Sequence, residues 1–92
     1  MFLTYRGAKM DITVYTLPNC VQCDNTKKML DRENIEYETV DMSDDMQALE
    51  MVKGLGYSAA PVVIAGDEHW GGFRLEKIKA LVSSLRLDTA TH

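Results

Sequence analysis

The chain has 92 residues, which is enough for one small domain with a thin core. Its 46% hydrophobic and 26% charged residues are typical of an ordinary globular protein and exclude an extensively disordered one. The net charge of −4 argues against nucleic-acid binding, because no basic surface is available to neutralise phosphates.

The apolar segments are too short for a membrane protein. The longest run, residues 59–65, has the length of a strand. The first residues lack the basic region and long apolar stretch of a secretion signal, so we expect no membrane association and a cytoplasmic location. In that compartment a lone cysteine pair is more often catalytic or metal-binding than structural.

In chain order, residues 1–10 show no clear period and are predicted to be an N-terminal extension to a domain spanning residues 11–86. Residues 12–16 are β-branched and aromatic and predict a strand. Residues 21–33 predict a helix whose inner face carries Cys23, Thr26 or Lys27, and Leu30. Residues 35–40 alternate and predict a second strand, parallel to the first and joined to it by a right-handed crossover.

The second half begins with a helix predicted over residues 46–55, capped by residues 43–45 and ended by Gly56. Its expected inner stripe is Leu49 and Val52 with Met46 or Leu55. Residues 60–65 and 68–70 predict an antiparallel hairpin. A last helix is expected over residues 75–85, before a C-terminal tail at residues 87–92; its apolar face is Leu75, Ile78, Leu81, Val82 and Leu85.

The two cysteines, Cys20 and Cys23, lie at the predicted start of the first helix. A C-x-x-C pair in this place is typical of a reversible dithiol, because unpaired amides and the helix dipole favour a thiolate. We expect Cys20 to be the exposed nucleophile that forms a mixed disulfide with a partner. Cys23, one turn further and more buried, then attacks Cys20 and releases the reduced partner. This chemistry requires no metal or other cofactor.

A metal-binding function is the alternative from a different class. A structural zinc site usually needs four ligands, and only His69 remains beside the two thiols in the expected core. A copper carrier is the better rival, since thiolates suit Cu(I). Copper carriers usually have methionine two residues before the first cysteine, whereas this chain has Pro18 there.

The chain contains the segments Pro18-Asn19-Cys20-Val21-Gln22-Cys23, Ala60-Pro61-Val62 and Trp70-Gly71-Gly72-Phe73-Arg74. Together these three segments resemble the NrdH-redoxins, a family of small glutaredoxin-like proteins. The resemblance implies an α/β thioredoxin/glutaredoxin-like fold of order β-α-β-α-β-β-α, a four-stranded mixed sheet of order 2-1-3-4 and three flanking helices. It also implies a monomeric electron carrier that thioredoxin reductase reduces and that donates electrons to class Ib ribonucleotide reductase.

The same resemblance implies roles for residues around the cysteines. Pro61 is expected to follow a cis peptide bond, so that the Ala60 backbone can pair with an incoming peptide. Arg74 is expected to anchor a nearby carbonyl, and His69 to be a surface residue of a strand. The expected partner contacts are Pro18, Asn19, Val21, Gln22, Gly71 and Gly72, beside a structural corner formed by Trp70, Phe73 and Arg74.

The chain departs from the family pattern at three positions. Leu17 stands where a basic residue is common, Gly71 replaces a serine and Leu75 replaces a proline. A glutathione-dependent glutaredoxin is the nearest alternative function. Glutathione carries two carboxylates and requires cationic contacts, so Leu17 and the lack of a charged pair after Gly72 disfavour glutathione binding. Arg74 could still contact a carboxylate, so the glutaredoxin function stays an alternative.

Overall fold

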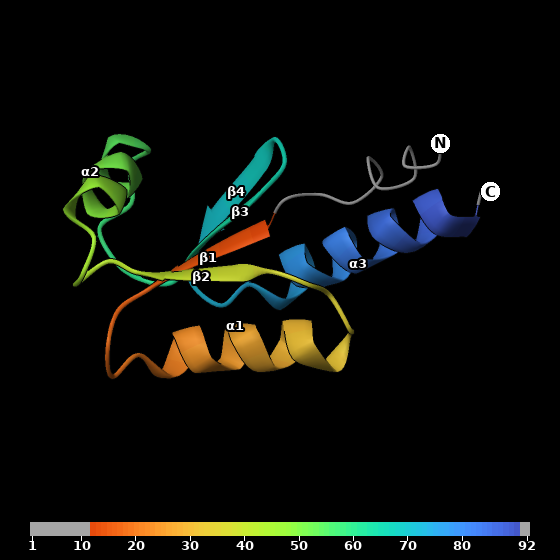
Figure 1. Cartoon of the computed structure of the whole chain (residues 1–92). Helices are drawn as coiled ribbons and strands as arrows, with labels where there is room; N and C mark the ends of the chain where they lie inside the picture. The colour runs from red at the N-terminus through yellow and green to blue at the C-terminus, as the bar shows by residue number, and fades with distance from the viewer. Residues whose placement is uncertain (1–11, 91–92) are drawn as a thin grey trace.

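The computed structural model describes residues 12–90 as seven elements in the predicted order (Figure 1). The expected N-terminal extension, residues 1–10, lies outside the described residues. The strands are β1 (Ile12–Thr16), β2 (Glu38–Asp41), β3 (Val62–Ala65) and β4 (Glu68–Gly71). The helices are α1 (Val21–Arg32), α2 (Met46–Gly54) and α3 (Leu75–Ala90).

The predicted sheet order is confirmed as β2-β1-β3-β4. Strand β1 pairs in parallel with β2, Val14 opposite Thr39, and antiparallel with β3, Val14 opposite Val63. Strand β4 pairs antiparallel with β3, with Trp70 opposite Val63. The sheet is therefore mixed, and its single parallel pair is the β1-α1-β2 unit that carries the cysteines.

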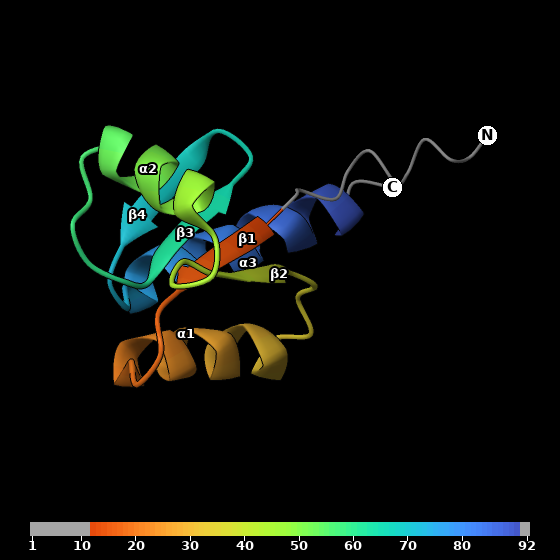
Figure 2. The same ribbon diagram turned by 60° about the vertical axis from the view of Figure 1, so that its left-hand side comes forward.

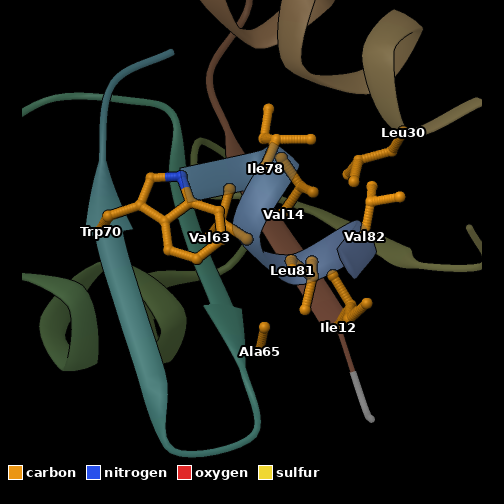
Figure 3. Packing of buried hydrophobic residues seen from close by; sticks show 9 residues of the cluster. All are labelled: Ile12, Val14, Leu30, Val63, Ala65, Trp70, Ile78, Leu81 and Val82. Carbon is orange, nitrogen blue, oxygen red and sulfur yellow. The ribbon is translucent and has the colours of Figure 1, made fainter. Parts of the chain in front are cut away.

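Alternating side chains on the central strands divide the core into two layers. Val14 and Val63 face α1 and α3, whereas Tyr15 and Val62 face α2. Accordingly, α2 lies on the opposite side of the sheet from α1 (Figures 1 and 2). Figure 3 shows the larger layer, in which side chains from β1, β3, β4, α1 and α3 meet; its members are Ile12, Val14, Leu30, Val63, Ala65, Trp70, Ile78, Leu81 and Val82.

Three element boundaries differ from the prediction by two residues or more. Strand β2 begins at Glu38, which pairs with Thr13 of β1, instead of at Ile35. Strand β3 begins at Val62, after the proline. Helix α3 continues to Ala90 instead of ending at Leu85, since no glycine or proline interrupts residues 86–90.

The inner faces of two helices also differ in part. On α2, Ala48 and Val52 are buried and Leu49 packs against them, whereas Met46 and Leu55 are exposed. The prediction that Met46 or Leu55 completes the inner stripe was wrong, because the two residues lie at the ends of the helix, as its first residue and its C-cap. On α3, Leu75 is likewise exposed at the helix start, while Ile78, Leu81 and Val82 are buried as predicted.

Helix α1 ends through a left-handed residue, Asn34, whose φ is 60°. The Ile35 amide donates to the Leu30 carbonyl, and the Asn34 amide donates to the Asp31 carbonyl. Tyr37 holds the following segment against α1, because its hydroxyl donates to the Asp31 carboxylate over 2.8 Å.

Tyr37 gives a pH dependence that can be measured. Burial, assisted by the hydrogen bond and charge of Asp31, raises the pKa of Tyr37 to about 12. In the folded state the phenol stays protonated at pH values above 10.0, the ordinary pKa of tyrosine. Its stabilising contribution is therefore complete below pH 10 and is lost as the pH rises through 12. We expect Tyr37→Phe to cost less than about 1 kcal/mol at pH 8, since the side chain is partly exposed. Urea unfolding between pH 8 and 12 should show that the free energy of unfolding declines less steeply with pH in the variant than in the original protein. An equal decline in the two proteins would contradict the raised pKa of Tyr37.

Candidate active site

The start of α1 is shaped by the residues just before it. Asn19 adopts a left-handed backbone with φ of 58°, a conformation that asparagine tolerates better than most residues. Cys20 follows as the N-cap in extended conformation, and its Sγ accepts a hydrogen bond from the Cys23 amide over 3.1 Å. The sulfur of Cys20 therefore occupies the position where a helix N-terminus stabilises a negative charge.

The two cysteines form a disulfide across the first turn of α1, with a Cα–Cα distance of 5.2 Å. Their environments differ. Cys20 is partly exposed, whereas Cys23 is 1% exposed within the interior. This asymmetry is the one required for Cys20 to meet a partner first and for Cys23 to resolve the mixed disulfide.

Gln22, between the cysteines, joins the helix start to the segment after β4. Its side-chain Oε1 accepts a hydrogen bond from the Phe73 amide over 3.1 Å. The preceding Gly72 amide donates to the Pro61 carbonyl over 2.8 Å, and the Ala60–Pro61 peptide bond is cis, as expected. Three segments far apart in the sequence thus meet beside the disulfide.

The two aromatic residues of the corner formed by residues 70–74 have a structural role. Trp70 is 5% exposed and packs in the core (Figure 3), and Phe73 packs against the same layer. Gly72 has a φ of 84°, which favours glycine. The expectation that the Arg74 side chain anchors a carbonyl is wrong, because its guanidinium donates to the Glu76 carboxylate at 2.7–2.8 Å.

Gly71 has a packing reason that sequence analysis missed. A Cβ at this position would lie 2.9 Å from Cδ1 of Tyr57, so the tyrosine ring fills the space that a serine would need. The Tyr57 hydroxyl also shares a 2.7 Å hydrogen bond with Nδ1 of His69, which is an exposed residue of β4 as expected. The only signal in the sequence was the absence of the family serine.

We expect Gly71→Ser to destabilise the protein by about 1–3 kcal/mol, because the Tyr57 ring must move. Gly54→Ser is the matched control, since a Cβ there has no atom within 4 Å. Thermal unfolding measures both. In a Tyr57→Ala background the cost of Gly71→Ser should shrink; an equal cost in both backgrounds would show that the ring is not the obstacle.

A groove of about 650 Å³ adjoins the C-x-x-C segment, because Gln22, the residue before Cys23, belongs to its lining. Gln22, Ala60, Gly71 and Gly72 line it, together with Arg74 and Lys77 on the α3 side. Four predicted contact residues are therefore brought together on one surface. The backbone of Ala60 lies at the edge of this groove, before β3 begins.

The residues next to Cys20 in the sequence are exposed and uncharged. Val21 is 72% exposed and Leu17 is 36% exposed, and Pro18 and Asn19 between Leu17 and the cysteine are exposed as well. Leu17 also borders a small apolar cavity of about 30 Å³ shared with Ala59. The exposed surface formed by residues 17–19 and 21 therefore carries no charged side chain.

Residues 12–90 contain no cluster of three or more histidine, cysteine or acidic side chains able to hold a metal ion. In the same part of the chain no helix has the length and apolar character needed to cross a membrane.

Comparison with known proteins places the described geometry in a known family. A family profile for glutaredoxin matches residues 12–70. The glutaredoxin-like protein NrdH of Escherichia coli K12 is 39% identical over 72 residues, covering 78% of this chain and 89% of the relative. NrdH of Lactococcus lactis subsp. lactis IL1403 is 33% identical over 70 residues, covering 76% of this chain and 97% of the relative.

A solved structure supports the same placement. NrdH-redoxin from Escherichia coli superposes with a TM-score of 0.76 at 39% identity, covering 78% of this chain and 95% of that protein. That protein is described as glutaredoxin-like with a thioredoxin-like activity profile. The predicted thioredoxin/glutaredoxin-like fold is thereby confirmed.

Proposed function

Because the chain belongs to the glutaredoxin family and, within it, to the glutaredoxin-like NrdH proteins, we propose that it carries electrons from thioredoxin reductase to class Ib ribonucleotide reductase. The chain is a thiol–disulfide oxidoreductase of the C-x-x-C type. The observation that carries the proposal is the C-V-Q-C sequence at the start of α1, with Cys20 partly exposed and Cys23 buried. Both proposed partners act in the cytoplasm, where we place this protein.

The mechanism uses the two sulfurs in turn. The Cys20 thiolate attacks a disulfide of the acceptor, forms a mixed disulfide and releases one acceptor thiolate. The Cys23 thiolate then attacks Cys20 Sγ, and the second acceptor thiolate leaves. Two electrons pass to the acceptor and the Cys20–Cys23 disulfide remains. The second step is fast because the attacking group is held one helical turn away.

The charges around the groove favour thioredoxin reductase over glutathione as the electron source. Glutathione has two carboxylates and requires cationic contacts. Leu17 is apolar, and the Arg74 guanidinium is paired with Glu76 over 2.7 Å. Lys77 is the remaining cation along the groove lining. A docking surface of mainly neutral side chains suits a protein partner better than this tripeptide.

A pair of coupled assays tests the proposal. NADPH consumption is followed with thioredoxin reductase alone, and separately with glutathione plus glutathione reductase, each with a class Ib ribonucleotide reductase as acceptor. We expect turnover in the first assay and little in the second. Turnover only with glutathione would replace the proposal by a glutathione-dependent glutaredoxin. Tight binding of one Cu(I) without reduction of any disulfide would favour the copper carrier.

Leu17 provides a further prediction. Leu17→Lys places a cation three residues before Cys20, so we expect a larger thiolate fraction of Cys20 at a given pH. Absorbance of the thiolate during titration of the reduced protein measures it, with an expected shift of up to about one pH unit. Leu17→Met is the uncharged control of similar size. Identical titrations of the two variants would refute the role of charge at this position.

A further inference from the structure

Thr26 has a buried hydroxyl without a hydrogen-bond partner. It lies on α1 one turn after Cys23, and both residues face the interior, with exposures of 0% and 1%. Within residues 12–90 the Thr26 Oγ1 atom has no partner. By contrast, the other buried threonine, Thr16, directs its hydroxyl to the Val40 carbonyl.

An unpaired buried hydroxyl is costly. Leaving such a group without a partner destabilises the fold by the free energy of its lost hydration, whereas valine has nearly the same shape and carries no such cost. The threonine side chain is therefore unfavourable in the disulfide form of this protein. A state in which its hydroxyl acquires a partner would explain why a polar side chain stands at this position.

The geometry of α1 indicates which group that partner is. Residues three apart lie on the same helix face, with Cβ atoms about 5–6 Å apart. Side chains on a helix lean toward its N-terminus, so the Thr26 side chain covers the turn that contains Cys23. In the disulfide form the Cys23 sulfur is bonded to Cys20 and is only a weak acceptor. Reduction turns it into a thiol or thiolate.

We propose that Thr26 is a positioning residue that donates a hydrogen bond to the Cys23 sulfur once the disulfide is reduced. This deepens the proposed function, but it rests only on the dithiol chemistry of Cys20 and Cys23 and on neither named partner. The Cys23 thiol must lose its proton to act, and burial disfavours the resulting charge. The Thr26 hydroxyl supplies a donor to that thiolate without giving up its proton.

The bond contributes to the resolving step. Cys23 thiolate attacks Cys20 Sγ, the bond between Cys20 and the partner sulfur breaks, and the partner leaves as a thiolate. Cys23 and Cys20 are left as a disulfide, and the partner sulfur has gained the electron pair. Thr26 stabilises the attacking thiolate and is released when the disulfide forms.

The experiment compares Thr26→Val, which removes the hydroxyl, with Thr26→Ser, which keeps it. Each protein is equilibrated with reduced and oxidised dithiothreitol, and the disulfide fraction is measured by mass spectrometry after alkylation. We expect Thr26→Val to shift the equilibrium toward the disulfide about three- to tenfold. At about 30 mV per tenfold change, this makes the potential roughly 15 to 30 mV more negative. Thr26→Ser should restore the original value.

Two further measurements separate this role from a merely structural one. Urea unfolding of the oxidised proteins should show Thr26→Val no less stable than the original, because the lost hydroxyl was unpaired in that form. Resolution of a mixed disulfide between Cys20 and a small aromatic thiol should be slower in Thr26→Val and require higher pH. Recovery of both properties in Thr26→Ser is expected.

An unchanged equilibrium in Thr26→Val, or a shift toward the dithiol, would overturn the proposal. So would a Thr26→Ser protein that behaves like Thr26→Val. These results are distinct from failure of the proposed function, because no reductase or ribonucleotide reductase is used. A protein that thioredoxin reductase does not reduce still gives a measurable equilibrium with dithiothreitol.

Discussion

The turnover rate of the Cys20→Ser protein in the coupled assay with thioredoxin reductase is expected to be at least about a thousandfold lower than that of the original protein. Serine cannot form the mixed disulfide, and Cys23 is too buried to replace Cys20, with 1% of its surface exposed. NADPH consumption at saturating reductase measures the loss.

This substitution is informative because it preserves the local fold. Cys20 is the N-cap of α1, where its side chain accepts from the Cys23 amide, and serine is a preferred residue at that position. We therefore expect an unchanged circular dichroism spectrum. Substantial turnover by a folded Cys20→Ser protein would show that Cys20 is not the nucleophile.

Cys23→Ser is expected to have an equally large effect of a different kind. Cys20 should still attack a partner disulfide, but the mixed disulfide should accumulate because no second thiol resolves it. Non-reducing electrophoresis after mixing with oxidised ribonucleotide reductase should show one adduct that disappears on addition of dithiothreitol. Turnover should be nearly abolished although the first attack remains.

The two serine variants are matched controls for each other. An adduct with Cys23→Ser and none with Cys20→Ser supports the order of attack inferred from their exposures. An adduct formed by Cys20→Ser alone would reverse the two roles. The double serine variant should form no adduct, which checks that the covalent link uses these sulfurs.

The elements that carry the site follow local rules, which is why they were predictable. The N-cap at Cys20 and the inner face of α1 each depend on residues within one or two helical turns. The hairpin of β3 and β4 likewise depends on the two-residue turn between its strands. The cis bond before Pro61 came from family resemblance and not from local pattern, since trans is the strong default for such bonds.

Other contacts join residues that are distant along the chain, and no local pattern contains them. The Phe73 amide bonds Gln22 across 51 positions, and the Tyr57 ring occupies the space beside Gly71. The side chain of Arg74 was expected to reach a carbonyl, but a nearer carboxylate, Glu76, forms the stronger charge-assisted bond.

The sequence alone predicted the dithiol at the start of a helix, the order of strands and helices, and the family. These features depend on the spacing of residues and on short motifs. Tertiary packing decided how deeply each sulfur is buried, what meets in the groove and which polar atoms remain without a partner. Exposure and hydrogen-bond satisfaction are properties of all neighbours in space. For that reason the roles of Cys20 and Cys23 were predictable in outline, while Tyr57 and Thr26 gained significance only from the folded chain.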